Sequence, residues 1–444
     1  MKNILKFLLL LVVMSVVFLA ACNSEDTSTD SQNEDSETTN KDEKVKITFQ
    51  AWGNPAEIEV YNRAVDAFME ENPNITVEMV PSPGEQYEQK LLTSLQGSSG
   101  PDVFYAHEPT MAKMIEAGIV EPLNDFFATE DSYSKLEDFP EGLYGPAKKD
   151  GQYYGVTPDV NPMVIYYNKG VFEEAGVKTP QEYYDEGNWN WDTFEEVTSQ
   201  LMAADKKGFV LENWWGHWYS WIWSNGGQIF DENGKLVLHE NEKGQEGIKF
   251  MDQLVQNGNA IYAGSLPQGQ GVDAMFMSNQ VGMISGGRWF TPQFDQNPNL
   301  DYDYIYLPSN TDQIQNPVGV PVAYMAVNGS SKNKEAAMKF VSYYVGQQGQ
   351  ELRTGEGGSA MPSHPDADNA TLAATDSTKH FNYFLDARNN GFTHGSNLAY
   401  DAQYPGLSAD IEEEMDLMFL GKQDAETTID HIVELIKERE EATQ

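Results

Sequence analysis

The sequence predicts an α/β fold in which strands and helices alternate along the chain. Residues 45–117 switch between segments of strand composition and segments with apolar residues at helical spacing. The connections between these strands have the length of parallel crossovers. The chain has 444 residues, of which 40% are hydrophobic and 12% aromatic, so it can bury a large core in two or three domains. Global disorder is therefore excluded.

The first part of the chain contains the clearest alternation. Residues 46–52 have strand composition, and Asn54 and Pro55 then supply a cap and a first-turn proline for a helix that ends before Pro73. Residues 75–80 alternate as a second strand. The expected elements that follow are a helix over 86–95, a turn at 97–100, a strand over 102–106 and a helix over 109–117. In such a domain, ligand loops lie at the ends of the strands.

The order changes after residue 153, where the chain is expected to enter a second domain. Residues 154–156 and 163–167 are strand-like on either side of a proline-bounded turn at 158–162. An Asn-Gly pair predicts a hairpin over 229–238. A further strand is expected over 318–328, and helices over 169–175, 192–203, 334–344, 408–419 and 425–441.

The N-terminal segment reads as a signal peptide that ends at the only cysteine. Lys2 and Lys6 precede an apolar run over 7–21, and Leu-Ala-Ala leads directly into Cys22. This order resembles a bacterial lipobox, in which the cysteine is lipidated; a retained signal anchor or a buried N-terminal helix is the alternative. Residues 23–44 lack large apolar side chains and read as a flexible acidic tether. Two acyl chains on Cys22 would give stable membrane anchoring.

Composition excludes several classes of function. The net charge of −41 opposes general binding to nucleic acid or to anionic membrane surfaces. A single cysteine excludes internal disulfides and cysteine-rich zinc sites, and the seven histidines show no metal-ligand spacing. The sequence has no HExxH, GxSxG, P-loop or complete dinucleotide motif, so no cofactor and no metal are expected.

Several short motifs resemble family 1 extracellular solute-binding proteins, the sugar-binding components of bacterial ABC importers. The resemblance covers nearly all of residues 45–441. Its markers are YEQKL at 87–91, GPDVF at 100–104, YYNK at 166–169, WDTFE at 191–195, Gly226-Gly227, the segment 283–289 and NKEAA at 333–337.

The resemblance implies a two-lobed periplasmic-binding-protein-like fold of type II, with discontinuous lobes joined by hinge strands. Lobe 1 would comprise residues 45–156 and 318–362, and lobe 2 residues 157–317 and 363–444. Closure of the lobes on a sugar would present a surface to the permease subunits of an importer. The expected protein is a monomer, lipid-anchored to the outer face of the cell membrane, as in a Gram-positive bacterium.

Aromatic platforms are the first requirement of a sugar site, because sugars present flat C–H faces. Trp289 follows Gly286 and Gly287 and matches the family motif whose Trp lies under a sugar ring; core packing is the alternative. Five Trp residues crowd between 214 and 223, and we choose Trp218 as the one that meets the ligand, with Trp215 and His217 as further candidates. Tyr404 matches a late loop that carries an aromatic residue into the family's site.

Polar candidates follow the predicted strands. They are Asn54 after the first strand, Tyr105, His107 and Glu108 around the end of the 102–106 strand, and Asp159 at the first crossing between lobes. For Glu108 and Asp159, a helix cap or a hinge hydrogen bond is the alternative. Arg288 could pair with a uronate carboxylate, although a structural ion pair with an acidic side chain is the favoured reading.

Two other classes remain open from the sequence. A secreted, lipid-anchored glycoside hydrolase would also carry aromatic platforms and paired carboxylates, and a glycan-adhesion protein would also suit the tether. We expect a binding protein without catalytic residues. A neutral oligosaccharide is the default ligand, because the chain has few cations.

Overall fold

The computed structural model describes residues 44–443, except 83, 85–86, 98, 232–233, 268–269, 314, 375–377, 395–403 and 405. The predicted signal peptide, Cys22 and residues 23–43 of the predicted tether lie outside these residues. Among the described residues, no helix combines the length and the apolar composition needed to cross a bilayer.

The first sheet has the order β11-β3-β1-β2 and confirms the predicted parallel crossovers. β1 (Val45–Trp52) pairs in parallel with both β2 (Ile75–Ser82) and β3 (Val103–His107). β11 (Ala323–Val327) returns from far along the sequence and pairs antiparallel with β3. The alternation over residues 45–117 therefore forms one contiguous sheet with its crossover helices.

Helices flank this first sheet and bury one face each against it. The crossover helices are α1 (Pro55–Glu71), α2 (Tyr87–Gln96) and α3 (Glu108–Glu116). The remaining elements of this part are α4 (Asn124–Phe127), β4 (Lys148–Lys149), β5 (Gln152–Tyr153), α12 (Lys334–Val345), α13 (Gln347–Thr354) and α14 (Asp368–Ala373). α12 and α13 both pack against α1.

The second sheet has the order β10-β6-β9-β7-β8. Its strands are β6 (Val164–Asn168), β7 (Lys207–Leu211), β8 (Ala260–Tyr262), β9 (Val281–Gly286) and β10 (Tyr302–Ile305). β7 runs parallel to both β8 and β9, whereas β6 runs antiparallel to β9 and β10. The helices of this part are α5 (Lys169–Ala175), α6 (Pro180–Asp185), α7 (Trp191–Ala203), α8 (Trp215–Ser224), α9 (Glu242–Gln256), α10 (Val272–Met277), α11 (Thr291–Asp295), α15 (Asn382–His394), α16 (Leu407–Phe419) and α17 (Ala425–Thr443).

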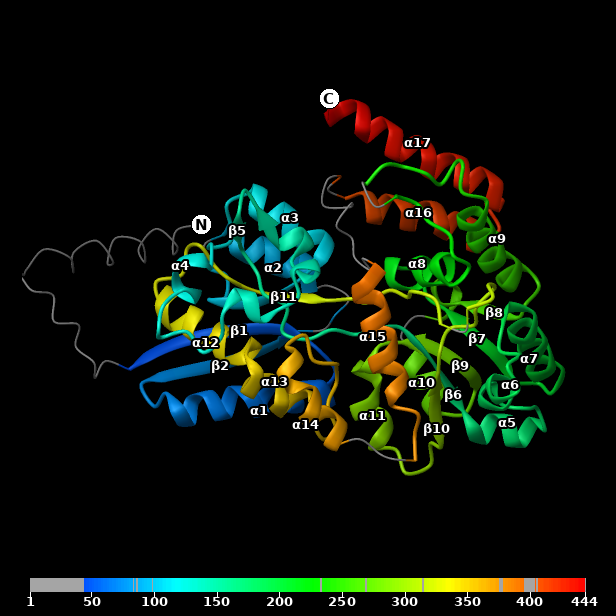
Figure 1. Cartoon of the computed structure of the whole chain (residues 1–444), viewed down its shortest axis with the longest axis horizontal. Coiled ribbons are helices and arrows are strands. Elements are labelled where there is room, and N and C mark those ends of the chain that lie inside the picture. Colours follow the sequence, from blue (N-terminus) through cyan, green and yellow to red (C-terminus); the bar gives the residue numbers. More distant parts are fainter. Residues whose placement is uncertain are drawn as a thin grey trace, which may run out of the picture. The chain divides into compact units, whose positions relative to one another are not determined.

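The two acidic helices at the end of the sequence pack on one helix of the second sheet. α16 and α17 contact one another, and both contact α9 (Figure 1). Their buried faces carry Ile411, Met415, Ile432 and Ile436, which are spaced as helical core positions. Acids such as Glu413, Glu438 and Glu441 lie outside these buried faces, whereas Asp416 accepts a hydrogen bond from Asn213 at the packed side. This arrangement explains how so acidic a segment still forms stable helices.

Three expected elements differ from the structure near the crossings between the sheets. Residues 318–322 and 154–156 lie outside the regular strands, and only β11 and isolated bridges such as Val156 with Met325 are formed there. The crossing segments instead bond to one another, with the Asn161 N–H donating to the Pro321 carbonyl at 2.9 Å. The hairpin expected at 229–238 forms without regular strands. Phe230 and Leu236 form an antiparallel bridge, flanked by hydrogen bonds from the Asp231 N–H to the Lys235 carbonyl and from the Val237 N–H to the Ile229 carbonyl; residues 232–233 lie outside the described part.

The segment after the expected boundary at residue 362 contains α14, which packs against α13. The expected lobe boundaries stay predictions.

Candidate functional site

Two tryptophans lie together at the carboxyl ends of parallel strands in the second sheet. Trp214 follows β7 and is the N-cap residue of α8, and Trp289 follows β9 in a single 3-10 turn. Their ring centroids are 6.2 Å apart, and both side chains are partly exposed. Because β7 and β9 are parallel neighbours, both residues meet at the same edge of the sheet. We call Trp214 and Trp289 the indole pair.

Each ring of the indole pair lies over a glycine. A Cβ on Gly216 would come within 2.3 Å of Cζ3 of Trp214, and a Cβ on Gly287 within 2.3 Å of Cζ3 of Trp289. No larger residue fits at either position without moving the ring. The glycines therefore fix how the two indoles are presented.

A second aromatic pair lies at the corresponding edge of the first sheet. Trp52 ends β1 and His107 ends β3, and their rings stack at a centroid distance of 3.8 Å. Glu88 holds this histidine, because its Oε1 lies 2.7 Å from Nδ1 of His107 and accepts the His107 backbone N–H at 2.9 Å. Both rings are partly exposed. An aromatic surface with a polar edge results.

Asn54 forms a capping box with Glu57 at the start of α1. Asn54 Oδ1 accepts the backbone N–H groups of Ala56 and Glu57, and Glu57 Oε2 accepts the Asn54 N–H at 2.9 Å. Burial raises the pKa of Glu57 to about 7, although the hydrogen bond from Asn54 opposes this shift. Asn54 itself is partly exposed, and its Nδ2 amide remains a possible donor.

Asp159 and Tyr105 belong to a buried polar network below β3. Asp159 Oδ2 pairs with Nη1 of Arg353 at 2.5 Å, and the Arg353 guanidinium lies 4.0 Å from the Tyr344 ring centroid. The Tyr105 and Tyr344 hydroxyls are 3.0 Å apart. Burial raises the pKa of Asp159, whereas Arg353 acts to lower it. These contacts are compatible with the hydrogen-bonding alternative for Asp159, and its role as a ligand contact stays a prediction.

Arg288 does not form the structural ion pair expected for it, and the uronate contact stays a prediction. Its guanidinium donates to three backbone carbonyls, those of Thr354, Gly355 and Ala360, and it is 3% exposed. Burial lowers its pKa. No acidic side chain pairs with it among the described residues.

The remaining candidates are buried. Trp218 is 1% exposed and packs within the second core, and the His217 ring lies 2.8 Å from the Ser285 hydroxyl. Glu108 begins α3 and is 2% exposed. Tyr404 stacks with Phe230 at 6.4 Å, next to residues 395–403 and 405, which lie outside the described part.

Among the five tryptophans between 214 and 223, the partly exposed Trp214 is the one that lies beside Trp289, whereas the sequence prediction chooses Trp218. Trp214 and Trp52 are absent from the predicted set, although Trp52 ends β1 and Trp214 is the first aromatic residue after β7. The signal that could have found Trp214 is Gly216, two residues later, which mirrors Gly287 before Trp289.

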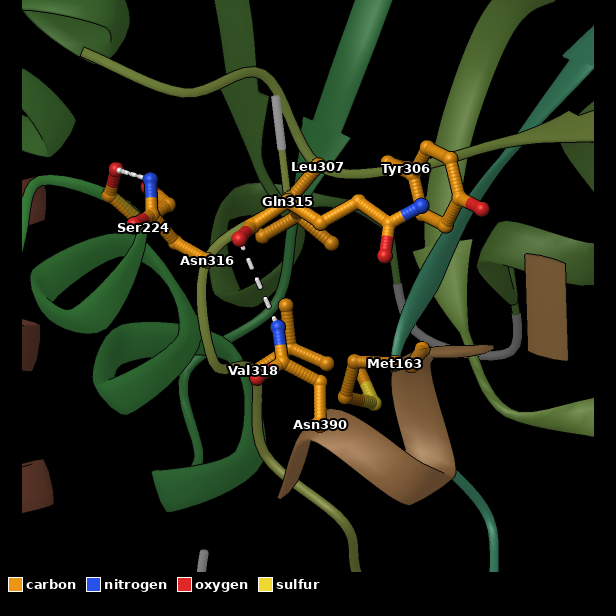
Figure 2. A pocket seen from close by; sticks show the side chains of 9 residues that line it. Met163, Ser224, Tyr306, Leu307, Gln315, Asn316, Val318 and Asn390 are labelled. Carbon is orange, nitrogen blue, oxygen red and sulfur yellow. Dashed lines mark hydrogen bonds between the residues drawn. The ribbon is translucent and has the colours of Figure 1, made fainter. Parts of the chain in front are cut away.

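Figure 2 shows a small cavity whose lining includes no residue of either aromatic pair. It has a volume of about 10 Å³ and lies beneath α15, where Asn316 donates to the Ser224 carbonyl and Asn390 to the Gln315 carbonyl. A cavity of this size holds about one water molecule. It is too small for a sugar. No group of three or more His, Cys, Asp or Glu side chains could hold a metal ion within the described ranges.

Comparisons with known proteins agree on one family. A family model described as bacterial extracellular solute-binding protein matches residues 52–351. An arabinooligosaccharide-binding protein of Halalkalibacterium halodurans is 25% identical over 298 residues, which cover 64% of each chain. A maltotriose-binding protein of Pyrococcus abyssi is 22% identical over 307 residues, covering 66% of this chain and 61% of that one. The matches span slightly less than two thirds of these relatives' lengths, as they do for relatives from Brucella at 66%.

Solved structures of similar fold cover most of the chain. An ABC substrate-binding protein of Listeria monocytogenes, in complex with cycloalternan, has a TM-score of 0.74 at 22% identity and covers 89% of this chain and 99% of its own. The GacH receptor of Streptomyces glaucescens has a TM-score of 0.72 at 21% identity, covering 89% and 99%. These likenesses confirm the predicted two-lobed α/β fold.

Proposed function

The chain belongs to the bacterial extracellular solute-binding protein family, and we propose that it captures an oligosaccharide and delivers it to an ABC-type importer. The observation that carries the proposal is the indole pair, held over Gly216 and Gly287 at the edge of the second sheet. Aromatic faces bind the C–H faces of sugar rings and leave the hydroxyls free for hydrogen bonds. Relatives named for arabinooligosaccharide and maltotriose, and a fold neighbour bound to cycloalternan, support this ligand class.

The proposed ligand-contacting residues come from both sheets. The indole pair would hold one ring, and Trp52 with His107 would contact another, which is why we propose an oligosaccharide instead of a single sugar. Asn54, Glu108 and Tyr404 remain candidates for hydrogen bonds to hydroxyls. Arg288, Asp159 and Tyr105 would support the site without contacting the ligand, since each makes hydrogen bonds within the protein. Trp218 would do so through its buried ring.

The ligand is expected to be neutral. The chain carries 28 basic against 69 acidic residues, and the guanidinium that could pair with a uronate, that of Arg288, is bound by backbone carbonyls. A guanidinium whose Nη1 and Nη2 already donate to three backbone carbonyls gains little from a further partner. Uncharged maltooligosaccharides and arabinooligosaccharides are therefore the first ligands to test.

We propose that the protein acts at the outer face of the cell membrane as a monomer held by a lipid on Cys22. The lipobox-like order before Cys22 and the polar residues 23–44 support this placement. The permease subunits of the importer would be its protein partners. Expression with Cys22→Ser tests the anchor: the variant should move from the membrane fraction to the medium, whereas retention on membranes would contradict a lipid at this residue.

We also propose that the protein releases its ligand chemically unchanged. The candidate Asp159 is paired with Arg353, and Glu57, the capping partner of Asn54, accepts the Asn54 N–H, so neither acts as a free carboxylate of a hydrolytic pair. Incubation of the purified protein with the two oligosaccharide classes, followed by chromatography, tests this directly. Intact sugar with a raised melting temperature supports the proposal. Shortened products would instead indicate a glycoside hydrolase.

A further inference from the structure

A short turn connects Trp289 to the helices of the first sheet, and Arg288 lies at its centre. β9 ends at Gly286, and Gly287, Arg288 and Trp289 follow directly. The Arg288 backbone N–H donates to Oδ1 of Asn161 at 3.0 Å, which ties the turn to the first crossing segment. A Cβ on Gly287 would meet Cβ of Asn161 at 2.6 Å, so the turn and the crossing are in close contact.

The guanidinium of Arg288 binds the C-terminus of α13. Nη1 donates to the Thr354 carbonyl at 2.5 Å and to the Ala360 carbonyl at 3.0 Å, and Nη2 donates to the Gly355 carbonyl at 3.2 Å. Thr354 is the last residue of α13, whose final carbonyls lack partners within the helix. A cation at this end also complements the helix dipole.

The bound helix belongs to the first sheet's packing. α13 contacts α1 and α12, which cover that sheet. On its other side the guanidinium lies 4.6 Å from the Phe381 ring centroid, just before α15. Arg288 therefore joins the turn that carries Trp289 to a helix layer built by a different part of the chain.

We propose that Arg288 is a positioning residue that sets the orientation of Trp289 for sugar binding by anchoring its turn to α13. This inference rests on the proposed function for its effect on affinity. The backbone of residue 288 can move little, because its N–H and its side chain are both bound. Trp289 is the next residue, so its indole takes its position from that anchor.

A lysine at position 288 should provide only part of the anchoring that Arg288 provides. Nη1 and Nη2 of the planar Arg288 guanidinium together donate to the three carbonyls. Lysine has a single ammonium nitrogen and cannot reproduce this arrangement. The chain also offers a matched control in Arg63, whose Nη1 donates to the neighbouring Glu356 carbonyl at 2.5 Å from an exposed position on α1. Arg63→Met removes a similar bond to the same segment without touching the turn of Trp289.

The test uses the protein labelled with 5-fluorotryptophan, in which the Trp289 fluorine signal is assigned by its loss in Trp289→Phe. Without sugar, Arg288→Met should shift or broaden this signal, Arg288→Lys should do so less, and Arg63→Met should leave it unchanged. With maltotriose or arabinotriose, whichever the wild type binds, Arg288→Met should weaken affinity about tenfold or more, in keeping with losing hydrogen bonds to a charged group. Arg288→Lys should fall between Arg288→Met and the wild type.

The test distinguishes a failure of the proposed function from a failure of the positioning role of Arg288. If the wild type binds neither sugar class, the proposed function fails, and the fluorine spectra still decide the positioning role. An unchanged Trp289 signal in a folded Arg288→Met variant would overturn that role. If Arg288→Met does not fold, Arg288→Lys decides: a Trp289 signal and affinity identical to the wild type would overturn it.

Discussion

The indole rings of Trp214 and Trp289 lie 6.2 Å apart at an interplanar angle of 53°, each folded over a glycine at the end of a parallel strand. Two rings at this angle form an open corner, and both are partly exposed. A flat sugar face can lie against either ring while the other ring contacts its edge. This relationship is the physical basis of the proposed binding function.

Replacing either indole should weaken sugar binding more than it weakens the fold. Trp289→Ala and Trp214→Ala should each cost about 1–3 kcal/mol of binding free energy, as when a stacking aromatic is lost. The partly exposed rings contribute less to the core than a fully buried one would. Titration calorimetry and thermal unfolding measure the two effects together. Unchanged affinity with reduced stability would place the indole pair in the core.

Trp218 should behave in the opposite way. Its side chain is 1% exposed and packs 4.2 Å from the Tyr219 ring centroid. Trp218→Ala should lower the free energy of unfolding by about 3–5 kcal/mol, because it leaves a cavity in the core. The affinity of the molecules that remain folded should be close to wild type. If Trp218→Ala lowers the affinity and leaves the stability unchanged, Trp218 contacts the ligand.

Removing Asp159 should destabilise the protein by leaving Arg353 buried without its charge partner. The pair is bonded at 2.5 Å, with side-chain exposures of 11% and 1%. Asp159→Ala should cost about 3–5 kcal/mol in chemical denaturation, and Asp159→Leu combined with Arg353→Met should cost less than the sum of the separate changes. The exposed pair of Lys46 and Glu78 is the control, and Glu78→Ala should cost less than about 1 kcal/mol. Equal losses for the two acids would contradict a special role of burial.

The stability of the protein should depend on pH through Glu57. Its pKa is raised from 4.5 to about 7 in the folded state, so the folded protein keeps a proton that the unfolded chain releases above about pH 4.5. Glu57 therefore lowers stability progressively as pH rises from about 4.5 to about 7, and the loss persists above that range.

Glu57→Gln should remove this loss while keeping the capping box, since Gln also accepts the N-cap N–H. At pH 8 the variant should be more stable than the wild type by about 1–3 kcal/mol, and at pH 4 the two should agree. Glu59→Gln, at an exposed position of the same helix, controls for the change in net charge. A stability difference that is equal at pH 4 and pH 8 would show that ionisation of Glu57 is not its cause.

The sequence predicts the first sheet well because its periodicity is strong. The capping signal at Asn54 and Pro55, and the alternation over 75–80, identify elements that the structure confirms within a few residues. The crossing segments are also apolar, and composition alone cannot distinguish a strand from a chain that bonds only at single bridges. The strand expected over 318–328 therefore begins only at Ala323.

The candidate site is predicted less completely because its geometry depends on distant residues. Arg288 lies 66 residues before Thr354 and 72 before Ala360, so no local sequence pattern predicts that it binds their carbonyls. Likewise, helical spacing groups Trp214 with Trp218, but only the strand end before α8 and the glycine beneath its ring make Trp214 the partly exposed one. The sequence contains the residue types needed for sugar binding, but it does not show which of these residues form the candidate site.

Titration calorimetry of the protein, with its tether but without the signal peptide, against maltooligosaccharides and arabinooligosaccharides tests the central claim most directly. We predict saturable binding of one class with one sugar per protein, and a marked loss of affinity in Trp289→Ala. No binding heat with any member of either class, or binding that is equally strong without Trp289 and Trp214, would contradict an oligosaccharide site built on the indole pair.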